Sequence, residues 1–146
     1  MHGPGTLDWT PALDHPDLLA APVAAALARA PAAEAGAVLV ARIDPGLADT
    51  AAFCATYEVG LDVSANCVVL VAKRSGAGHL AACVVLATTR ADVNGVARRA
   101  LGARKASFAS MDAAVAESAM EYGGITPIGL PPDWPVLVDA SVAGAG

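Results

Sequence analysis

Two uninterrupted apolar runs stand out in the middle of the chain, at residues 67–72 and 80–87. Both runs are rich in valine, and β-branched side chains favour extended strands. Residues 73–79 between them carry two basic side chains and two glycines. Glycine allows the backbone conformations that tight turns require. The pattern therefore predicts two long neighbouring strands joined by a hairpin-like turn.

The rest of the pattern mixes helical and extended segments. Asp92 and Ser110 can cap the helices that follow them, and Gly102 can end the first of these. Helices are expected at residues 16–30, 49–57, 93–101 and 111–119. Shorter strands are expected at residues 37–43, 105–108 and 136–139. A hairpin inside such a mixed order favours an α+β fold over repeated βαβ units.

The length of 146 residues is that of one domain. Residues 1–15 are rich in Gly, Pro and Asp and predict a flexible lead-in, which leaves residues 16–146 as a single domain. Alanine occurs 36 times, whereas Trp, Tyr and Phe occur twice each. We therefore expect a core of small aliphatic side chains. The longest apolar run, residues 18–27, is shorter than the ~20 residues that cross a bilayer, so no membrane partner is expected.

The cysteines and histidines argue against a bound metal. The three cysteines, Cys54, Cys67 and Cys83, form no CxxC pair, and the three histidines are scattered. An odd number of separated cysteines is also unlike a disulfide framework and fits the reducing cytoplasm. We therefore expect no metal site and no cofactor. Cys67 is either a nucleophile or a small core side chain.

Charge is unevenly distributed along the chain. The net charge is −5, which argues against nucleic acid, and no DNA partner is expected, but residues 73–105 hold seven basic side chains and one acidic one. A concentration of one sign can form a patch that meets phosphates. The alternative is a set of solvated surface charges. The candidates for RNA contact are Lys73, Arg74, Arg98, Arg99, Arg104 and Lys105.

Residues 123–129, Gly-Gly-Ile-Thr-Pro-Ile-Gly, form the most unusual stretch of the chain. Glycine reaches positive φ and lets a ligand approach the backbone, while proline restricts φ. Such a loop can aim N–H groups at an oxyanion, a carbonyl or a phosphate, although it could also be a plain connection. Beside it, Tyr122 could stack on a base or sugar, or could hold the loop to the core. Asp139, at the end of a predicted strand, is a further polar candidate.

A family resemblance rests on the order of four segments. Ala-Leu-Gly-Ala-Arg-Lys-Ala at residues 100–106 is followed by the predicted helix at 111–119, the loop at 123–129 and Val-Leu-Val-Asp at 136–139. This order resembles the YbaK/EbsC family, also called the prolyl-tRNA-synthetase-associated editing domain, over residues 53–139. The resemblance implies a curved, barrel-like mixed sheet flanked by helices. It also implies hydrolysis of wrongly charged aminoacyl-tRNA, whose 3′ end would enter a pocket.

The resemblance also implies the site residues. In such proteins the glycine- and proline-containing loop lines the pocket, and its backbone N–H groups hold the aminoacyl carbonyl. Gly123, Gly124 and Asp139 would then be catalytic. The residues expected to bind substrate are Asn66, Cys67, Tyr122, Ile125, Thr126, Pro127 and Gly129. The basic segment 73–105 would face the acceptor stem by charge.

The chain departs from the family pattern at three places. A lysine normally opens the first long strand, and here either Asn66 or Cys67 takes its place. Ser118 and Ala119 stand where Thr-Gly is usual, and relatives continue beyond Asp139, which suggests a truncated C-terminus. These departures leave two readings open. One is a bacterial, cytoplasmic trans-editing deacylase that removes a small amino acid from a tRNA such as that for proline. The other is a non-catalytic module that binds tRNA or another adenylated ligand; a homodimer formed through the apolar strands is also considered.

Overall fold

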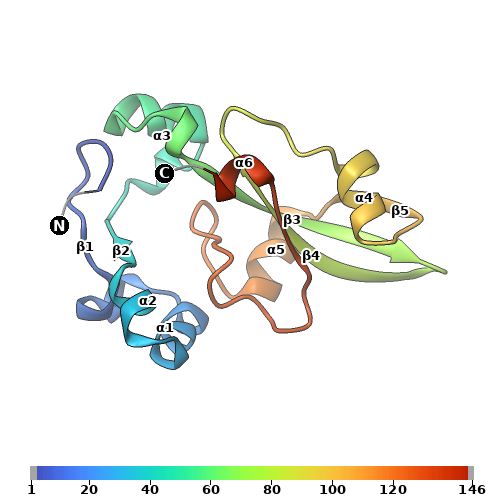
Figure 1. The fold of residues 1–146 in the computed structure, drawn as a ribbon, viewed down its shortest axis with the longest axis horizontal. Coiled ribbons are helices and arrows are strands. Elements are labelled where there is room, and N and C mark those ends of the chain that lie inside the picture. Colours follow the sequence, from blue (N-terminus) through green and yellow to red (C-terminus); the bar gives the residue numbers. More distant parts are fainter. Residues whose placement is uncertain (1–2, 145–146) are drawn as a thin grey trace.

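The fold is built on a four-stranded mixed sheet, seen in a computed structural model that describes residues 3–144 (Figure 1). The strand order is β5–β3–β4–β6. β3 (Ala65–Arg74) and β4 (Ala77–Leu86) form a long antiparallel hairpin, β5 (Lys105–Phe108) runs antiparallel to β3, and β6 (Val136–Val138) runs parallel to β4. The α+β class is confirmed. The barrel-like shape is wrong, because closure requires the two edge strands to pair, and β5 and β6 lie at opposite edges.

Short helices and a small second sheet surround this sheet. The α-helices are α1 (Ala21–Arg29), α2 (Ala32–Gly36), α3 (Thr50–Tyr57), α4 (Arg98–Ala100), α5 (Met111–Ser118) and α6 (Ala140–Ala143). The second sheet pairs β1 (Thr10–Pro11) with β2 (Leu39–Val40). Single 3₁₀ turns cover Ala12–Asp14, Pro16–Leu18, Pro45–Leu47 and Leu61–Val63, and one π-helical turn covers Val93–Ala97. Among the described residues, no helix has the length and hydropathy needed to cross a membrane.

The predicted hairpin is present, but its turn is tighter than expected. The strands extend to Arg74 and Ala77, so only Ser75 and Gly76 form the turn. Both have positive φ, +48° and +87°, as a two-residue turn that matches the strand twist requires. Lys73 and Arg74 therefore belong to β3 rather than to a loop.

Two predicted helices differ from the expectation in ways that local chemistry explains. The expected helix at 16–30 is a 3₁₀ turn followed by α1, which begins next to Pro22. Proline lacks an N–H and clashes with the preceding turn, so no continuous helix can pass through it. The expected helix at 93–101 is a π turn followed by α4. Asp92 caps it through bonds from the N–H groups of Gly95 and Val96 (3.0 and 3.2 Å), and Gly102 follows with φ +62°.

The core has two parts, and the second one anchors the glycine-rich loop. One part packs the π turn and β5 on one face of the hairpin, with Leu70 and Ala106 almost fully buried. The other gathers buried side chains of the N-terminal half around Met120, and partly buried Ile125, Ile128 and Leu130 pack against it. The apolar side chains of residues 125–130 therefore hold the loop on the molecule.

The first fifteen residues lie against the rest of the chain where the structure describes them. β1 pairs with β2, and Ala12 is completely buried in the second part of the core. The flexibility expected for residues 1–15 and a domain boundary at residue 16 stay predictions.

Candidate functional site

The loop at residues 123–129 leaves helix α5 through a strained residue. Ala119 has φ +57°, in the left-handed region that favours glycine, and its N–H donates to the Val115 carbonyl at 3.0 Å. Ser118 is buried, and its Oγ accepts a hydrogen bond from the N–H of Met120 at 3.2 Å. The Ser-Ala pair, which departs from the Thr-Gly of the family pattern, thus still makes the helix end that directs the chain into the loop.

Internal hydrogen bonds hold the shape of the loop. The N–H of Gly124 donates to the Glu121 carbonyl at 2.9 Å, and that of Thr126 donates to the Sδ of Met120 at 3.5 Å. Thr126 Oγ1 accepts from the N–H of Ile128 at 3.4 Å. Within residues 3–144, no hydrogen bond uses the N–H of Gly123. That N–H is therefore available to a ligand.

The three glycines of the loop have different roles. Gly123 has φ +82°, and a Cβ on it would lie 2.6 Å from the Cβ of Ala48. Gly129 has φ +87°, and a Cβ there would lie 2.5 Å from the Pro22 carbonyl oxygen. A Cβ on Gly124 would only reach the Glu121 carbonyl oxygen, at an ordinary 3.6 Å. Gly123 and Gly129 are thus required for close packing against the N-terminal half, whereas Gly124 has space for a side chain.

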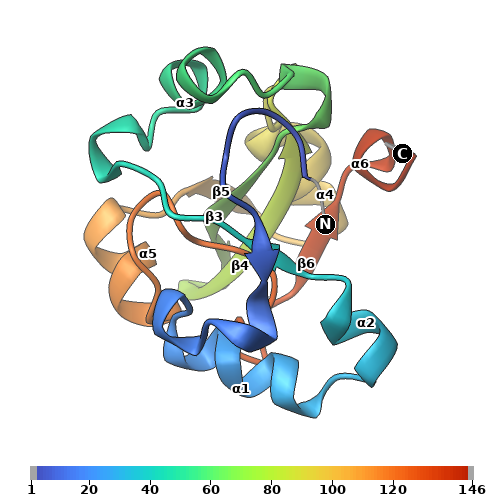
Figure 2. The same cartoon turned by 90° about the vertical axis from the view of Figure 1, so that its left-hand side faces the viewer.

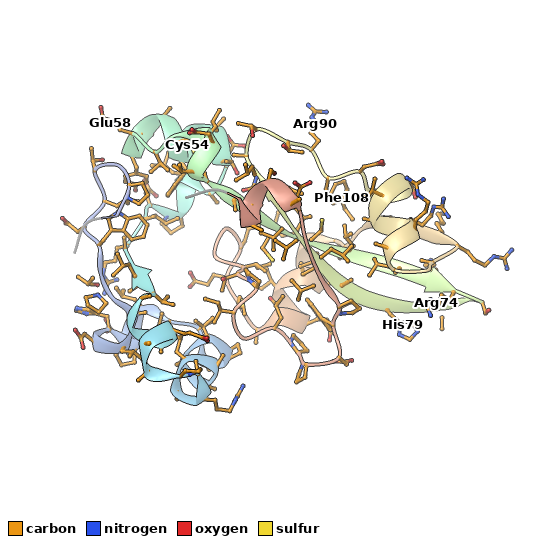
Figure 3. The ribbon with its side chains drawn as sticks, in the orientation of Figure 1. Cys54, Glu58, Arg74, His79, Arg90 and Phe108 are labelled. Atoms are coloured by element: carbon orange, nitrogen blue, oxygen red, sulfur yellow. The ribbon has the colours of Figure 1, made fainter. Side chains whose placement is uncertain are left out.

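Two cavities lie beside the start of β3, and the loop borders both. The first has a volume of about 220 Å³ and is mainly apolar. Cys67 lines it from β3, and Tyr122 and Ile125 line it from the loop. Phe108, Met111 and Tyr122 are large side chains more than half exposed around it, and Figure 3 labels Phe108. The remaining lining residues are Val68, Val69, Ala109, Ala114 and Val115.

The second cavity, of about 280 Å³, combines polar and apolar walls. Asn66 from β3 and Gly123 from the loop both line it, together with Thr50 at the start of α3. The Oγ1 of Thr50 donates to the Oδ1 of Asn66 at 2.8 Å, which leaves the Asn66 NH₂ group free to donate elsewhere. The other lining residues are Pro4, Trp9, Ile43, Leu47, Ala48, Phe53, Val59, Val63, Ser64 and Ala65.

Position along β3 separates two residues that the sequence could not separate. Ala65 and Asn66, at the start of the strand, line the cavity that contains Gly123. Cys67, Val68 and Val69, which follow them, line the cavity that contains Tyr122. β5 covers β3 only from Leu70 onward, so both cavities lie beside a part of β3 that this strand leaves open.

Cys67 is not a thiolate at neutral pH. Burial, and secondarily the neighbouring Cys83, raise the pKa of the Cys67 thiol to about 11. Because the thiolate is the reactive form, a thiol with this pKa is a poor nucleophile. Cys67 thus contributes to the first cavity by its shape and polarity.

Asp139 caps a helix. Its Oδ1 accepts hydrogen bonds from the N–H and the Oγ of Ser141, at 2.9 and 2.6 Å, at the start of α6. The hydroxyl of Ser141, followed by its N–H, lowers the pKa of Asp139 below its usual value. The N–H of Asp139 donates to Val84, on the side of β4 away from β3. Among the predicted catalytic and substrate-binding residues, those that line neither cavity are Gly124, Thr126, Pro127, Gly129 and Asp139.

Lys73, Arg74 and Lys105, from β3 and β5, lie at the other end of the hairpin, where Figure 3 labels Arg74. Lys73 is about 23 Å from Asn66, at ~3.3 Å per strand residue, and it lies opposite Lys105 in the β3–β5 register. The Arg74 guanidinium donates to the Leu101 carbonyl. The guanidinium of Arg98 donates to the carbonyls of Asn94 and Ala103, at 2.8 and 3.4 Å. The two arginines therefore also stabilise the fold around α4.

Thr50 and Trp9 are among the residues of the second cavity that sequence reasoning missed. Thr50 contacts Asn66 across 16 positions of the chain, and no local signal indicates such a contact. Trp9 lies in a segment whose composition predicts a flexible lead-in.

Among the described residues, no cluster of three His, Cys, Asp or Glu side chains is arranged to hold a metal ion.

An open mixed sheet with a glycine-rich loop beside its first long strand defines a small α+β domain with two cavities beside the start of that strand. Residues 44–145 match the family model of the aminoacyl-tRNA editing domain. The match covers well over half of the chain, so the protein belongs to this family, and the predicted resemblance is confirmed. No protein with a curated description is similar enough to match.

Two solved structures share the fold. One is described as a "putative trans-editing enzyme for prolyl tRNA synthetase"; it has a TM-score of 0.56 and 18% identity, over 70% of this chain and 61% of that one. The chain thus spans somewhat less than two thirds of this relative. The other comes from epitope backbone grafting by computational design on scaffold proteins, with a TM-score of 0.66 and 20% identity over 86% of this chain and 74% of that one. At these identities the likeness concerns the fold.

Proposed function

We propose that this protein hydrolyses the ester bond of a mischarged aminoacyl-tRNA in trans and releases a small amino acid from a tRNA such as that for proline. The observation that carries the proposal is the cavity that Asn66 and Gly123 both line, within a domain of the editing family. It offers an unused backbone N–H and a side-chain NH₂ group beside an apolar wall. These are the groups needed to hold an ester carbonyl and a small side chain.

In this proposal the aminoacyl carbonyl oxygen accepts a hydrogen bond from the N–H of Gly123. The Asn66 NH₂ group, oriented by Thr50, donates to the same oxygen or to the attacking water. Water adds to the carbonyl carbon, the bond to the ribose oxygen breaks, and that oxygen leaves with a proton as the tRNA 3′-hydroxyl. Donors that are already in place stabilise the negative charge of the tetrahedral intermediate and account for much of the rate.

The first cavity is suited to the terminal nucleoside of the tRNA. Tyr122 is bonded directly to Gly123, so a ligand that places its ester at Gly123 has its sugar and base within reach of the Tyr122 side chain. Exposed Tyr122 and Phe108 offer aromatic surfaces, and single-stranded bases stack on such surfaces with little dependence on sequence. The basic end of the hairpin, about 23 Å away along β3, would then meet phosphates of the acceptor stem.

The test is hydrolysis of a panel of mischarged tRNAs by the intact, folded protein. We expect deacylation of one or more small aminoacyl esters well above the spontaneous rate, and loss of that activity in Asn66→Leu, which keeps the side-chain size but removes the donor. A panel in which no ester is cleaved faster than in buffer would refute the enzymatic function. An active Asn66→Leu variant would refute the role of the carboxamide.

A second function is favoured by one departure from the family pattern. The resemblance leads us to expect a lysine where Asn66 or Cys67 stands, and neither of these side chains carries its positive charge. A domain without that charge could bind the aminoacylated or adenylated end of a ligand without cleaving it. This alternative predicts tRNA binding without hydrolysis, with log K falling linearly as log salt rises. Negligible binding at low salt would exclude it.

A further inference from the structure

One wall of the second cavity comes from outside the region that matches the editing family. The family match begins at residue 44, but Pro4, Trp9 and Ile43 line the same cavity as Asn66 and Gly123. In Figure 2 this N-terminal segment, drawn in dark blue, passes between α3 and α1 on the side that faces the viewer. The segment therefore adds to the candidate site a wall that the family match does not account for.

Several contacts hold this wall in place. The N–H and the Oγ1 of Thr6 both donate to the carbonyl of Tyr57, at 2.8 and 3.2 Å, and Gly5 packs closely on the same carbonyl with φ +73°. On the other side of Trp9, Thr10 pairs with Val40 in the small second sheet. The segment is thus attached to the end of α3 before Trp9 and to β2 directly after it.

The indole N–H of Trp9 has a hydrogen-bond acceptor within the same segment. Its Nε1 donates to the carbonyl of Pro4 at 2.8 Å, and the side chain is half-buried. Tryptophan has a large rigid surface, and its N–H normally needs a partner when buried. Because that partner is supplied by the same segment, the ring can present an apolar surface to the cavity. Leu47, Ala48 and Phe53 add further apolar surface from the other side.

We propose that Trp9 is a specificity-determining residue that limits the size of the aminoacyl side chain accepted at this site. The inference rests on the proposed function and assigns the size limit of its aminoacyl substrate to one residue. The cavity volume of about 280 Å³ is at the lower end of ligand sites. Each additional methylene that meets a fixed apolar wall changes selection by about 10- to 200-fold. Removal of the indole should therefore admit larger aminoacyl groups.

The test compares wild-type protein, Trp9→Ala and Trp9→Phe on alanyl and leucyl esters of the same tRNA. We expect kcat/KM for the leucyl ester, relative to the alanyl ester, to rise about 10-fold or more in Trp9→Ala. In Trp9→Phe, which retains an aromatic side chain in the wall, this ratio of kcat/KM values should rise less. Circular dichroism and thermal unfolding show whether each variant is folded. An unchanged ratio in a folded Trp9→Ala variant would overturn the inference.

A second measurement does not depend on catalysis or on an enlarged cavity. The chain has two tryptophans, so Trp134→Phe leaves Trp9 as the only one. Titration of this variant with a stable amide analogue of 3′-alanyl-adenosine should shift or quench Trp9 emission. If wild-type protein cleaves no ester but Trp9 emission responds to the analogue, the proposed hydrolysis is refuted and the placement of Trp9 beside the ligand is supported. If esters are cleaved and Trp9 emission does not respond, the role of Trp9 is refuted and the proposed hydrolysis is supported.

Discussion

Gly123→Ala is the substitution for which the structure makes the sharpest prediction. The new Cβ would lie 2.6 Å from the Cβ of Ala48, on a residue whose φ is +82°. Carbon atoms in contact prefer separations of about 3.5–4.0 Å, so the loop must move by about 1 Å or the backbone must leave its left-handed conformation. Either change displaces the N–H that we assign to the ester carbonyl.

The magnitude follows from two known costs. A non-glycine residue in the left-handed region costs roughly 1–2 kcal/mol, and the free energy of unfolding should fall by about that amount. A displacement of about 1 Å at a reacting group costs about 100-fold in rate. We therefore expect kcat/KM for deacylation to fall about 100-fold, while most of the protein remains folded in buffer.

Gly124→Ala is the matched control one residue away. A Cβ on Gly124 meets only the Glu121 carbonyl oxygen, at 3.6 Å, and φ is not in the left-handed region. A compatible Gly→Ala change stabilises by about 0.4–1 kcal/mol through the unfolded chain. Single-turnover deacylation and urea unfolding should therefore show nearly wild-type activity and slightly higher stability. Equal losses in the two variants, or full activity in folded Gly123→Ala, would refute the reasoning.

Three further predictions concern other parts of the molecule. Arg74→Ala removes the bond to the carbonyl near α4 and should lower the free energy of unfolding by about 1.5 kcal/mol in urea titrations, whereas Lys73→Ala should change it by less than about 0.5 kcal/mol. Cys67 should react slowly with iodoacetamide at pH 7. The pKa of its thiol is raised from 9.0 to about 11 in the folded protein, so the folded state keeps this proton to a higher pH than the unfolded state does. The free energy of unfolding should therefore fall as the pH rises from 9.0 to about 11, and Cys67→Ala should reduce that fall. If the basic end of the hairpin meets phosphates, replacing Lys73 and Lys105 together by alanine should weaken tRNA binding and reduce the slope of log K against log salt by about 2, as measured by fluorescence anisotropy.

Local signals were sufficient to predict much of the fold. The apolar runs predicted the β3–β4 hairpin, which the structure confirms. Ser110 caps α5 as expected, because its Oγ accepts a hydrogen bond from the Ala113 N–H at 3.1 Å. The glycine and proline content of residues 123–129 indicated a shaped loop. These features depend on neighbouring residues, so a single sequence contains them.

Long-range contacts explain what could not be predicted. Which cavity Asn66 and Cys67 each line depends on how the loop, α3 and α5 pass the start of β3. The bond between Thr50 and Asn66, and the position of Trp9, bring together segments separated by 16 and 57 positions. The different roles of Gly123 and Gly124 depend on Ala48, which lies in another part of the chain.

In the proposed function, an aminoacyl ester is held in the cavity that Gly123 and Asn66 both line. The most direct measurement is an NMR titration of the protein with the stable amide analogue of 3′-alanyl-adenosine. We expect the largest shifts for the backbone N–H of Gly123 and the side-chain NH₂ of Asn66, with no shift at His79 near the far end of the hairpin, labelled in Figure 3. Binding that shifts neither Gly123 nor Asn66 would contradict this proposal.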